Sequence, residues 1–296
     1  MIQHFFCRLR LMSLLIVSFW GLTACSTLGT FNSLVPKDGG AERAAQDISF
    51  GSLPRQKLDL YRPTQAYAEG SQSELPVIVF IHGGSWQDGN KDGYSFVGRA
   101  LASRGFVVAI PNYRLVPDVR YPAFLQDNAA AVTWVIENIT QYGGDPSRIV
   151  LVGHSAGAYN AAMLALDERW LGSGRQNVRG FVGLAGPYDF LPLDGEVTQA
   201  AFGNEENLET TQPISFATAD DPPVLLLHGA DDTTVYPRNS ETLGDRLVQS
   251  GANARSEIYP GLGHVGILTA LARPFRGEAP VLDDTTEFAR EVTSQP

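Results

Sequence analysis

Uninterrupted runs of apolar residues recur along the chain, separated by segments of different character. Such runs are typical of strands that are buried on both faces of a sheet. They predict strands over residues 76–81, 106–110, 148–152, 178–184 and 223–227. Residues 255–259 predict one further strand. Residues 48–52 and 57–61 alternate between apolar and polar side chains, which predicts an antiparallel pair at an edge of the sheet.

The segments between these strands predict helices. The expected helices cover about 93–104, 122–141, a stretch that begins at Ala158, and 237–250. Strands that alternate with helices at this spacing form an α/β fold with a mostly parallel, doubly wound sheet. Residues 186–222 break the alternation, because Pro, Asp, Glu and aromatic residues occur there without a period. We expect this segment to form a small cap over one edge of the sheet.

Composition narrows the class of protein. The chain of 296 residues is 44% hydrophobic and 18% charged, which describes a folded globular protein. Its length fits one large α/β domain or two small ones. The net charge of −10 argues against nucleic acid as a partner. No cluster in the sequence has the spacing of metal ligands, and no G-x-G-x-x-G follows a first strand, so neither a metal nor a nucleotide cofactor is implied.

The N-terminus predicts a targeting segment. Arg8 and Arg10 precede an apolar run over 11–20 that is too short to span a bilayer comfortably. The sequence then continues as Leu-Thr-Ala-Cys, ending at Cys25, and this resembles the bacterial lipobox. An uncleaved anchor, or a secretory signal with a coincidental cysteine, is the alternative interpretation.

The lipobox resemblance implies a division of the chain. We expect a signal peptide over 1–24, a lipidated tether over 25–45 that starts at Cys25, and a folded domain over 46–296. A lipid on this cysteine would make the membrane a partner, and the position would be in the bacterial cell envelope. Because Ser26 and not Asp follows the cysteine, resemblance to Gram-negative lipoproteins favours the outer membrane, with the domain facing the periplasm.

Ser155 stands in the most informative motif. Residues 153–157 have the sequence Gly-His-Ser-Ala-Gly and lie between the predicted strand 148–152 and a helix. In this context G-x-S-x-G is typical of a nucleophile elbow, a tight turn that exposes the serine hydroxyl above the sheet edge. An ordinary glycine-rich turn between strand and helix is the alternative interpretation.

A serine hydroxyl needs a neighbouring base to become a good nucleophile. His264 stands in a late loop after the last predicted strand and is our candidate for this base. His82, His154 and His228 adjoin predicted strands, and we interpret these three as structural hydrogen-bonding residues. An acid would orient the imidazole, and the adjacent Asp231 and Asp232 are both candidates.

A glycine-rich loop predicts hydrogen-bond donors for a developing oxyanion. Residues 82–86, His-Gly-Gly-Ser-Trp, directly follow the predicted strand 76–81. Such a loop presents backbone N–H groups without obstruction by side chains. The expected donors are the amides of Gly84 and Ser85, together with that of Ala156. A phosphate-binding loop is the alternative, but the Lys-Ser/Thr pair that would end it is missing.

Taken in order, these motifs resemble the α/β-hydrolase superfamily. They are most similar to its carboxylesterase branch, which includes hormone-sensitive-lipase-like, kynurenine-formamidase-like and feruloyl-esterase-like proteins. The motifs are H-G-G-x-W, Asn-Tyr-Arg-Leu at 112–115, G-H-S-A-G, H-G-x-x-D and G-x-x-H. The resemblance implies that Ser155 attacks, that His264 is the base, and that Asp232, which fits H-G-x-x-D, is the acid in preference to Asp231.

The resemblance also implies an activity. We expect a serine hydrolase that cleaves carboxylic esters of small molecules through an acyl-enzyme, without a cofactor. A formamidase or amidase, or a catalytically silent binding lipoprotein, remains the alternative. Hormone-sensitive-lipase-like proteins usually have H-G-G-G, whereas serine and tryptophan follow the two glycines here, which favours small esters and formamides. Trp86, Tyr159, Tyr188 and Phe190 are candidates for the substrate pocket, and a place in the hydrophobic core is the alternative for each of them.

Overall fold

The computed structural model describes residues 27–64 and 74–294. These residues form one sheet of eight strands in the order β1-β2-β4-β3-β5-β6-β7-β8. β1 and β2 are antiparallel to each other, β2 is antiparallel to β4, and the strands from β4 to β8 are parallel. The mostly parallel α/β sheet is thereby confirmed. The strands are β1 Ala41–Ser49, β2 Lys57–Pro63, β3 Leu75–Ile81, β4 Val107–Pro111, β5 Gly144–His154, β6 Val178–Leu184, β7 Val224–Gly229 and β8 Ala254–Tyr259.

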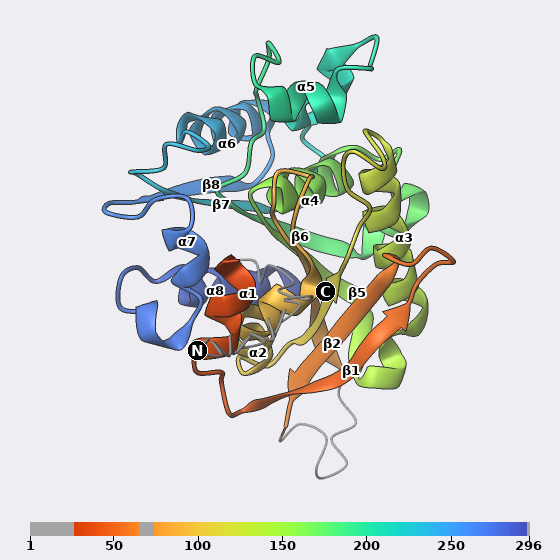
Figure 1. The fold of residues 1–296 in the computed structure, drawn as a ribbon, viewed down its shortest axis with the longest axis vertical. Coiled ribbons are helices and arrows are strands. Elements are labelled where there is room, and N and C mark those ends of the chain that lie inside the picture. Colours follow the sequence, from red (N-terminus) through yellow and green to blue (C-terminus); the bar gives the residue numbers. More distant parts are fainter. Residues whose placement is uncertain (1–26, 65–73, 295–296) are drawn as a thin grey trace, which may run out of the picture.

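Helices cover both faces of this sheet (Figure 1). Helices α3, α4 and α6 pack on one face, and α2, α7 and α8 pack on the other. The helices are α1 Thr27–Leu34, α2 Ser95–Ala102, α3 Ala123–Asn138, α4 Ala156–Leu166, α5 Glu196–Phe202, α6 Arg238–Ser250, α7 Gly266–Thr269 and α8 Val281–Ser294. Within the described ranges, none of these helices combines the length and apolar character needed to cross a bilayer.

The two-sided cover explains why the strands are continuously apolar. In β5, Ile149 and Leu151 belong to the core on the α3–α4 face, whereas Val150 and Val152 belong to the core on the α2–α8 face. All four side chains are fully buried. Alternate residues of a strand point to opposite faces, so a strand covered on both faces requires apolar residues at every position.

The expected tether over 25–45 is wrong for residues 27–45. These residues form α1 and the first half of β1, so the folded unit begins before residue 46. Phe31 of α1 makes an edge-to-face contact with Phe96 of α2 at 5.3 Å between ring centroids. The first half of β1 could not be recognised from the sequence, because β1 is an edge strand and only Ala41 is buried there. The predicted signal peptide over 1–24 and the lipid site at Cys25 lie outside the described residues.

Besides α1, three helices were not predicted: α5, the single turn α7 and α8. Helix α5 lies inside the segment 186–222, and its seven residues are too few to establish a helical period. Helix α8 near the C-terminus packs on β5, β6 and β7 through Phe288, Ala289 and Val292. Figure 1 shows α5 at the end of the molecule, beyond α4 and α6.

The parallel strands bring the predicted motifs to one edge of the sheet. The glycine-rich loop follows β3, and Ser155 follows β5. Asp232 follows β7, and His264 follows β8. All four positions come after the C-terminal ends of parallel strands, where ligands bind in sheets of this kind.

Candidate active site

Ser155 occupies a strained turn between β5 and α4. Its backbone angles are φ 56° and ψ −125°, a region that residues other than glycine rarely adopt. The two flanking glycines are required by close contacts: a Cβ atom on Gly153 would overlap the backbone of Gly157, and one on Gly157 would overlap the carbonyl oxygen of Ile81. The turn therefore lifts the serine out of the strand while its neighbours stay packed against the backbone.

The structure brings the three predicted triad residues together. His264 Nε2 lies 2.9 Å from Ser155 Oγ, and His264 Nδ1 lies 2.7 Å from Asp232 Oδ2. Asp232 is buried, whereas Asp231 is exposed, and none of the hydrogen bonds in the described part of the chain joins the Asp231 carboxylate to His264. The geometry thus selects Asp232 over its neighbour.

Four hydrogen-bonding groups surround the Asp232 carboxylate. Its Oδ1 accepts hydrogen bonds from the amides of Thr234 and Val235, at 2.8 and 2.9 Å. Its Oδ2 faces His264 and also lies 3.2 Å from His228 Nε2. Burial alone would raise the pKa of Asp232, but the hydrogen bonds from His264 and from the two amides outweigh it and lower this pKa. The carboxylate therefore stays ionised beside the imidazole.

The other three histidines of the folded part serve as hydrogen-bonding supports, as the sequence predicted. His154 Nε2 lies 3.0 Å from the carbonyl oxygen of His264. His82 stacks on Tyr113 at 4.4 Å between ring centroids. Burial lowers the pKa of His154 to about 3 and that of His82 to about 4, so both rings are neutral. Burial also lowers the pKa of His228.

The glycine-rich loop after β3 has a left-handed backbone. Gly84, Ser85 and Trp86 have φ angles of 122°, 54° and 57°. A side chain at Gly84 would overlap the carbonyl oxygen of Asp88, which explains the glycine. Tyr113 supports the loop, because its hydroxyl donates to the carbonyl oxygen of His82 at 3.0 Å.

Two of the three predicted oxyanion donors border the same pocket as Ser155. Ser85 and Ala156 both line it. Ala156 is the first residue of α4, so its amide N–H has no acceptor within the helix and lies at the positive end of the helix dipole. Gly84 instead borders a cavity of about 250 Å³ next to Thr27 and Leu28 of α1. Its role as a donor stays a prediction.

The pocket at Ser155 has a volume of about 400 Å³. Trp86 and Phe190 supply apolar wall, and the indole nitrogen of Trp86 donates to Asn160 at 3.1 Å. The expectation that Tyr159 and Tyr188 line this pocket is wrong. Both are fully buried outside the pocket wall.

Each of these tyrosines has a structural partner instead. Tyr159 stands behind Trp86, edge-to-face at 5.3 Å, and its hydroxyl donates to the carbonyl oxygen of Thr211 at 2.7 Å. Tyr188, at the start of the cap segment, packs edge-to-face on Phe181 of β6. Their aromatic character pointed to a pocket, but the same character suits a buried core equally well.

The polar part of the pocket has no signal in the sequence. The cap segment supplies Asp189 and Asp194, the start of α6 supplies Arg238 and Asn239, and Tyr236 lies just before that helix. None of these residues belongs to a motif, and they come together only because the cap folds back toward α6. The prediction that the segment 186–222 lies over this edge of the sheet agrees with the wall residues that it contributes.

Comparisons with known proteins match this architecture. The sequence model of the family described as BD-FAE matches residues 58–247, which is more than half of the chain. Among curated proteins, the isoprenylcysteine alpha-carbonyl methylesterase ICME of Arabidopsis thaliana is 30% identical over 265 residues, covering 80% of this chain and 60% of that protein. Esterase LipC of Mycobacterium tuberculosis is 29% identical over 243 residues, covering 73% of this chain and 58% of LipC.

The chain thus spans about three fifths of the length of these curated relatives. Among solved structures, a truncated form of a carbohydrate esterase from gut microbiota superposes with a TM-score of 0.76 at 24% sequence identity. The superposition covers 88% of this chain and 100% of that one. At this level of identity the likeness shows a shared fold.

Proposed function

Because the chain belongs to the BD-FAE family and has the α/β-hydrolase fold, we propose that it is a serine-dependent carboxylic ester hydrolase. The observation that carries the proposal is the continuous hydrogen-bonded chain from Asp232 through His264 to Ser155, which ends at the pocket. The curated relatives with printed activities are esterases and methylesterases, which supports the same reaction class.

The geometry supports an acyl-enzyme mechanism. His264 Nε2 accepts the proton of Ser155 Oγ as this oxygen attacks the acyl carbon, and Asp232 stabilises the imidazolium that forms. The amides of Gly84, Ser85 and Ala156 are the proposed donors to the carbonyl oxygen as it becomes negative. His264 then protonates the departing alcohol. Water repeats the sequence on the acyl-enzyme and releases the acid.

The pocket favours esters of small or aromatic acids. A volume of about 400 Å³ is at the small end of ligand pockets. Its apolar wall at Trp86 and Phe190 suits an acyl group, while Asp189, Arg238 and Asn239 offer hydrogen bonds to an alcohol group. We propose a small-molecule ester as the substrate, with short or aromatic acyl groups preferred.

Hydrolysis of p-nitrophenyl esters from acetate to laurate tests this function. We expect turnover that is highest for short chains and is lost in Ser155→Ala. Ser147→Ala changes an exposed serine near the start of β5. It serves as the matched control and should keep full turnover. Ester hydrolysis that survives in Ser155→Ala would contradict the proposed nucleophile.

Fluorophosphonate labelling separates the alternatives, because only an activated serine reacts. Labelling of Ser155 without ester hydrolysis would favour a formamidase or amidase, and N-formylarylamine substrates would then be tested. A folded protein that neither hydrolyses esters nor becomes labelled would be the catalytically silent binding protein.

We also propose that the chain is anchored in the bacterial envelope by a lipid on Cys25. The support is the sequence Leu-Thr-Ala-Cys after an apolar run, and the outer membrane facing the periplasm is the proposed position. Mass spectrometry of the expressed protein should find a chain that begins at a diacylglyceryl-modified Cys25. Cys25→Ala should lose the modification and Cys7→Ala should retain it. If the Cys25→Ala protein keeps its full length and stays bound to the membrane, the N-terminal segment is an uncleaved anchor instead.

A further inference from the structure

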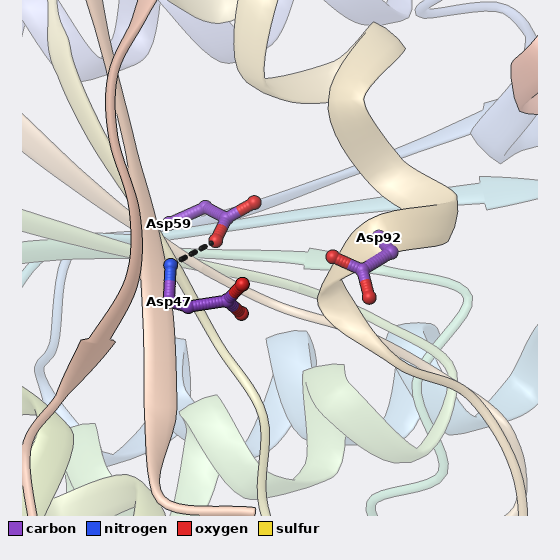
Figure 2. Close-up of side chains that lie close together, drawn as sticks. All are labelled: Asp47, Asp59 and Asp92. Atoms are coloured by element: carbon purple, nitrogen blue, oxygen red, sulfur yellow. Dashed lines mark hydrogen bonds between the residues drawn. The ribbon is translucent and has the colours of Figure 1, made fainter.

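A buried lysine lies next to the glycine-rich loop, in the middle of three carboxylates. Lys91 Nζ is 2.6 Å from Asp47 Oδ1, 2.8 Å from Asp59 Oδ1 and 2.8 Å from Asp92 Oδ1, and the lysine side chain is 1% exposed. Figure 2 shows how the three aspartates converge from two strands and from the turn before α2. Among the described residues this is the one acidic group compact enough for a metal ion, but the ammonium of Lys91 already contacts all three carboxylates.

Two of the three partners of Lys91 belong to the antiparallel hairpin at the sheet edge. Asp47 is in β1 and Asp59 is in β2, and the amide of Asp47 donates to Asp59 Oδ1 at 3.0 Å. Arg43 of β1 lies 3.6 Å from the other oxygen of Asp59. Burial by itself would lower the pKa of Lys91, but the hydrogen bonds that it donates to the aspartates raise this pKa above its ordinary value. The ammonium is therefore a permanent charge held by the hairpin.

Lys91 immediately follows the connection 82–90, which contains the glycine-rich loop and two of the proposed oxyanion donors. Its amide donates to Asn112 Oδ1 at 2.7 Å, and Arg55 donates to the carbonyl oxygen of Gly89 at 2.8 Å. The loop between β3 and Lys91 contains two residues other than glycine in the left-handed region, Ser85 and Trp86. A backbone of this kind persists only where its surroundings hold it in place. β3 fixes the start of this loop, and Lys91 fixes its other end.

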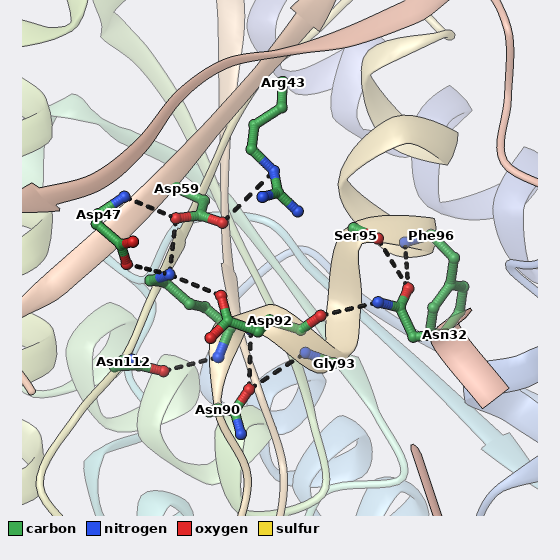
Figure 3. A network of polar contacts seen from close by, with 11 residues as sticks. Asn32, Arg43, Asp47, Asp59, Asn90, Asp92, Gly93, Ser95, Phe96 and Asn112 are labelled. Atoms are coloured by element: carbon green, nitrogen blue, oxygen red, sulfur yellow. Dashed lines mark hydrogen bonds and ion pairs between the residues drawn. The ribbon is translucent and has the colours of Figure 1, made fainter. Parts of the chain in front are cut away.

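The N-terminal helix attaches to the same place. Asn32 of α1 donates from Nδ2 to the carbonyl oxygen of Asp92 at 2.8 Å, and its Oδ1 accepts from Ser95 Oγ and from the amide of Phe96 (Figure 3). Both α1 and β1 are thus connected to the turn Lys91–Tyr94 (η1) that links the loop to α2. The N-terminal segment, α1 and β1, therefore supports the turn at the end of the loop.

We propose that Lys91 is a positioning residue for the oxyanion hole: its ammonium ties the end of the loop to Asp47 and Asp59, and this keeps the amide of Ser85 aimed at the substrate carbonyl oxygen. The inference rests on the proposed ester hydrolysis. Oxyanion donors act on the transition state and not on the bound substrate. Loss of the tie should therefore lower kcat and leave KM nearly unchanged.

Lys91→Met tests the proposal, because methionine keeps an apolar stem and removes the charge. We expect kcat per labelled active site to fall about 10–100-fold, as for a small misplacement of a catalytic group, with KM within about twofold of wild type. Lys91→Arg should recover part of the loss. Arg104→Met is the matched control, since it removes an ion pair with Asp283 at the other end of α2 and should not change kcat.

Two further measurements keep the inference separate from protein stability and from the proposed function. If Lys91→Met does not fold, Asp47→Asn removes one of the three partners and should show a smaller loss of the same kind. The rate constant of fluorophosphonate labelling reports the oxyanion hole without any ester substrate, and it should fall in parallel with kcat. Wild type that is labelled but hydrolyses no ester contradicts the proposed function alone. Unchanged labelling rates in folded Lys91→Met and Asp47→Asn, or a loss found entirely in KM, would overturn the role of Lys91.

Discussion

His154, the residue immediately before the candidate nucleophile, is hydrogen-bonded to the backbone of the candidate base. Its Nε2 lies 3.0 Å from the carbonyl oxygen of His264, and the two rings are 5.0 Å apart. Since burial lowers the pKa of His154 to about 3, the ring is neutral and Nε2–H is the donor. The elbow therefore fixes the loop of His264 as well as the position of Ser155.

Loss of this hydrogen bond should slow turnover. His154→Ala frees the backbone of His264, and the imidazole then reaches the serine in a less favourable orientation. We expect kcat to fall on the order of 10–100-fold with little change in KM. His154→Gln can still donate an N–H and should retain more activity. Steady-state kinetics normalised to active sites would measure both effects, and equal activity in the Ala and Gln variants would contradict the role of the hydrogen bond.

The same histidine predicts a pH dependence of stability. Its pKa is about 3 in the folded protein and about 6.5 in an unfolded chain, so between these values the unfolded state binds the additional proton. Stability must therefore rise with pH in this window and fall as the pH is lowered, by about 1.4 kcal/mol per pH unit for one proton.

His154→Gln removes this titration and isolates its effect. Between pH 6.5 and pH 5, wild type should lose about 2 kcal/mol more free energy of unfolding than the variant. Urea unfolding at the two pH values measures the difference. Equal losses in the two proteins would show that the ring takes up a proton in the folded state over this range.

Two adjacent aspartates offer a sharp test of the triad. Asp232→Asn keeps the size of the side chain but replaces the acceptor of the His264 Nδ1–H bond, and in triads this kind of change lowers kcat by about 10⁴-fold. Asp231→Asn changes an exposed neighbour and should leave kcat near the wild-type value. Ester hydrolysis under saturating substrate compares them. A greater loss in Asp231→Asn would reverse the assignment.

Much of this architecture was predictable because burial and chain geometry leave a clear mark on the sequence. The segment Val178–Leu184 is apolar throughout because helices cover both of its faces, and its predicted bounds match β6. The glycine at 153 is dictated by the backbone of Gly157 and Ala158, within about a turn of the serine. Local contacts of this kind can be recognised from the sequence without knowledge of the fold.

What could not be predicted depends on contacts between distant segments. The polar, alanine-rich first half of β1 has no apolar pattern, and its strand conformation comes from pairing with β2. Tyr159 and Tyr188 looked like pocket residues, but only the tertiary structure shows that both are fully buried and lie outside the pocket wall. Lys91 is an ordinary polar residue in the sequence, and its role emerges only when β1 and β2 bring two aspartates to it.

The contact between the elbow and β3 yields a last prediction. Gly157 lies so close to the end of β3 that an added Cβ would overlap the carbonyl oxygens of Ile81 and His82. These atoms lie where β3 passes into the glycine-rich loop, so the absence of a side chain sets the distance between Ser155 and the proposed oxyanion donors. Gly157→Ala must push α4 and the loop apart.

We expect Gly157→Ala to lose about 1–3 kcal/mol of stability from overpacking. In a chain of this size each kcal/mol lowers Tm by about 2–4 °C. The fluorophosphonate labelling rate should fall as well, because the serine and the loop move relative to each other. Gly195→Ala is the control: a Cβ there meets only Thr198 Oγ1 at 3.6 Å, so Tm and labelling should stay as in wild type. Calorimetry measures Tm, and fluorophosphonate labelling measures the reactivity of Ser155 in both variants. A Gly157→Ala protein with wild-type Tm and labelling rate would mean that the elbow and β3 are not in this close contact.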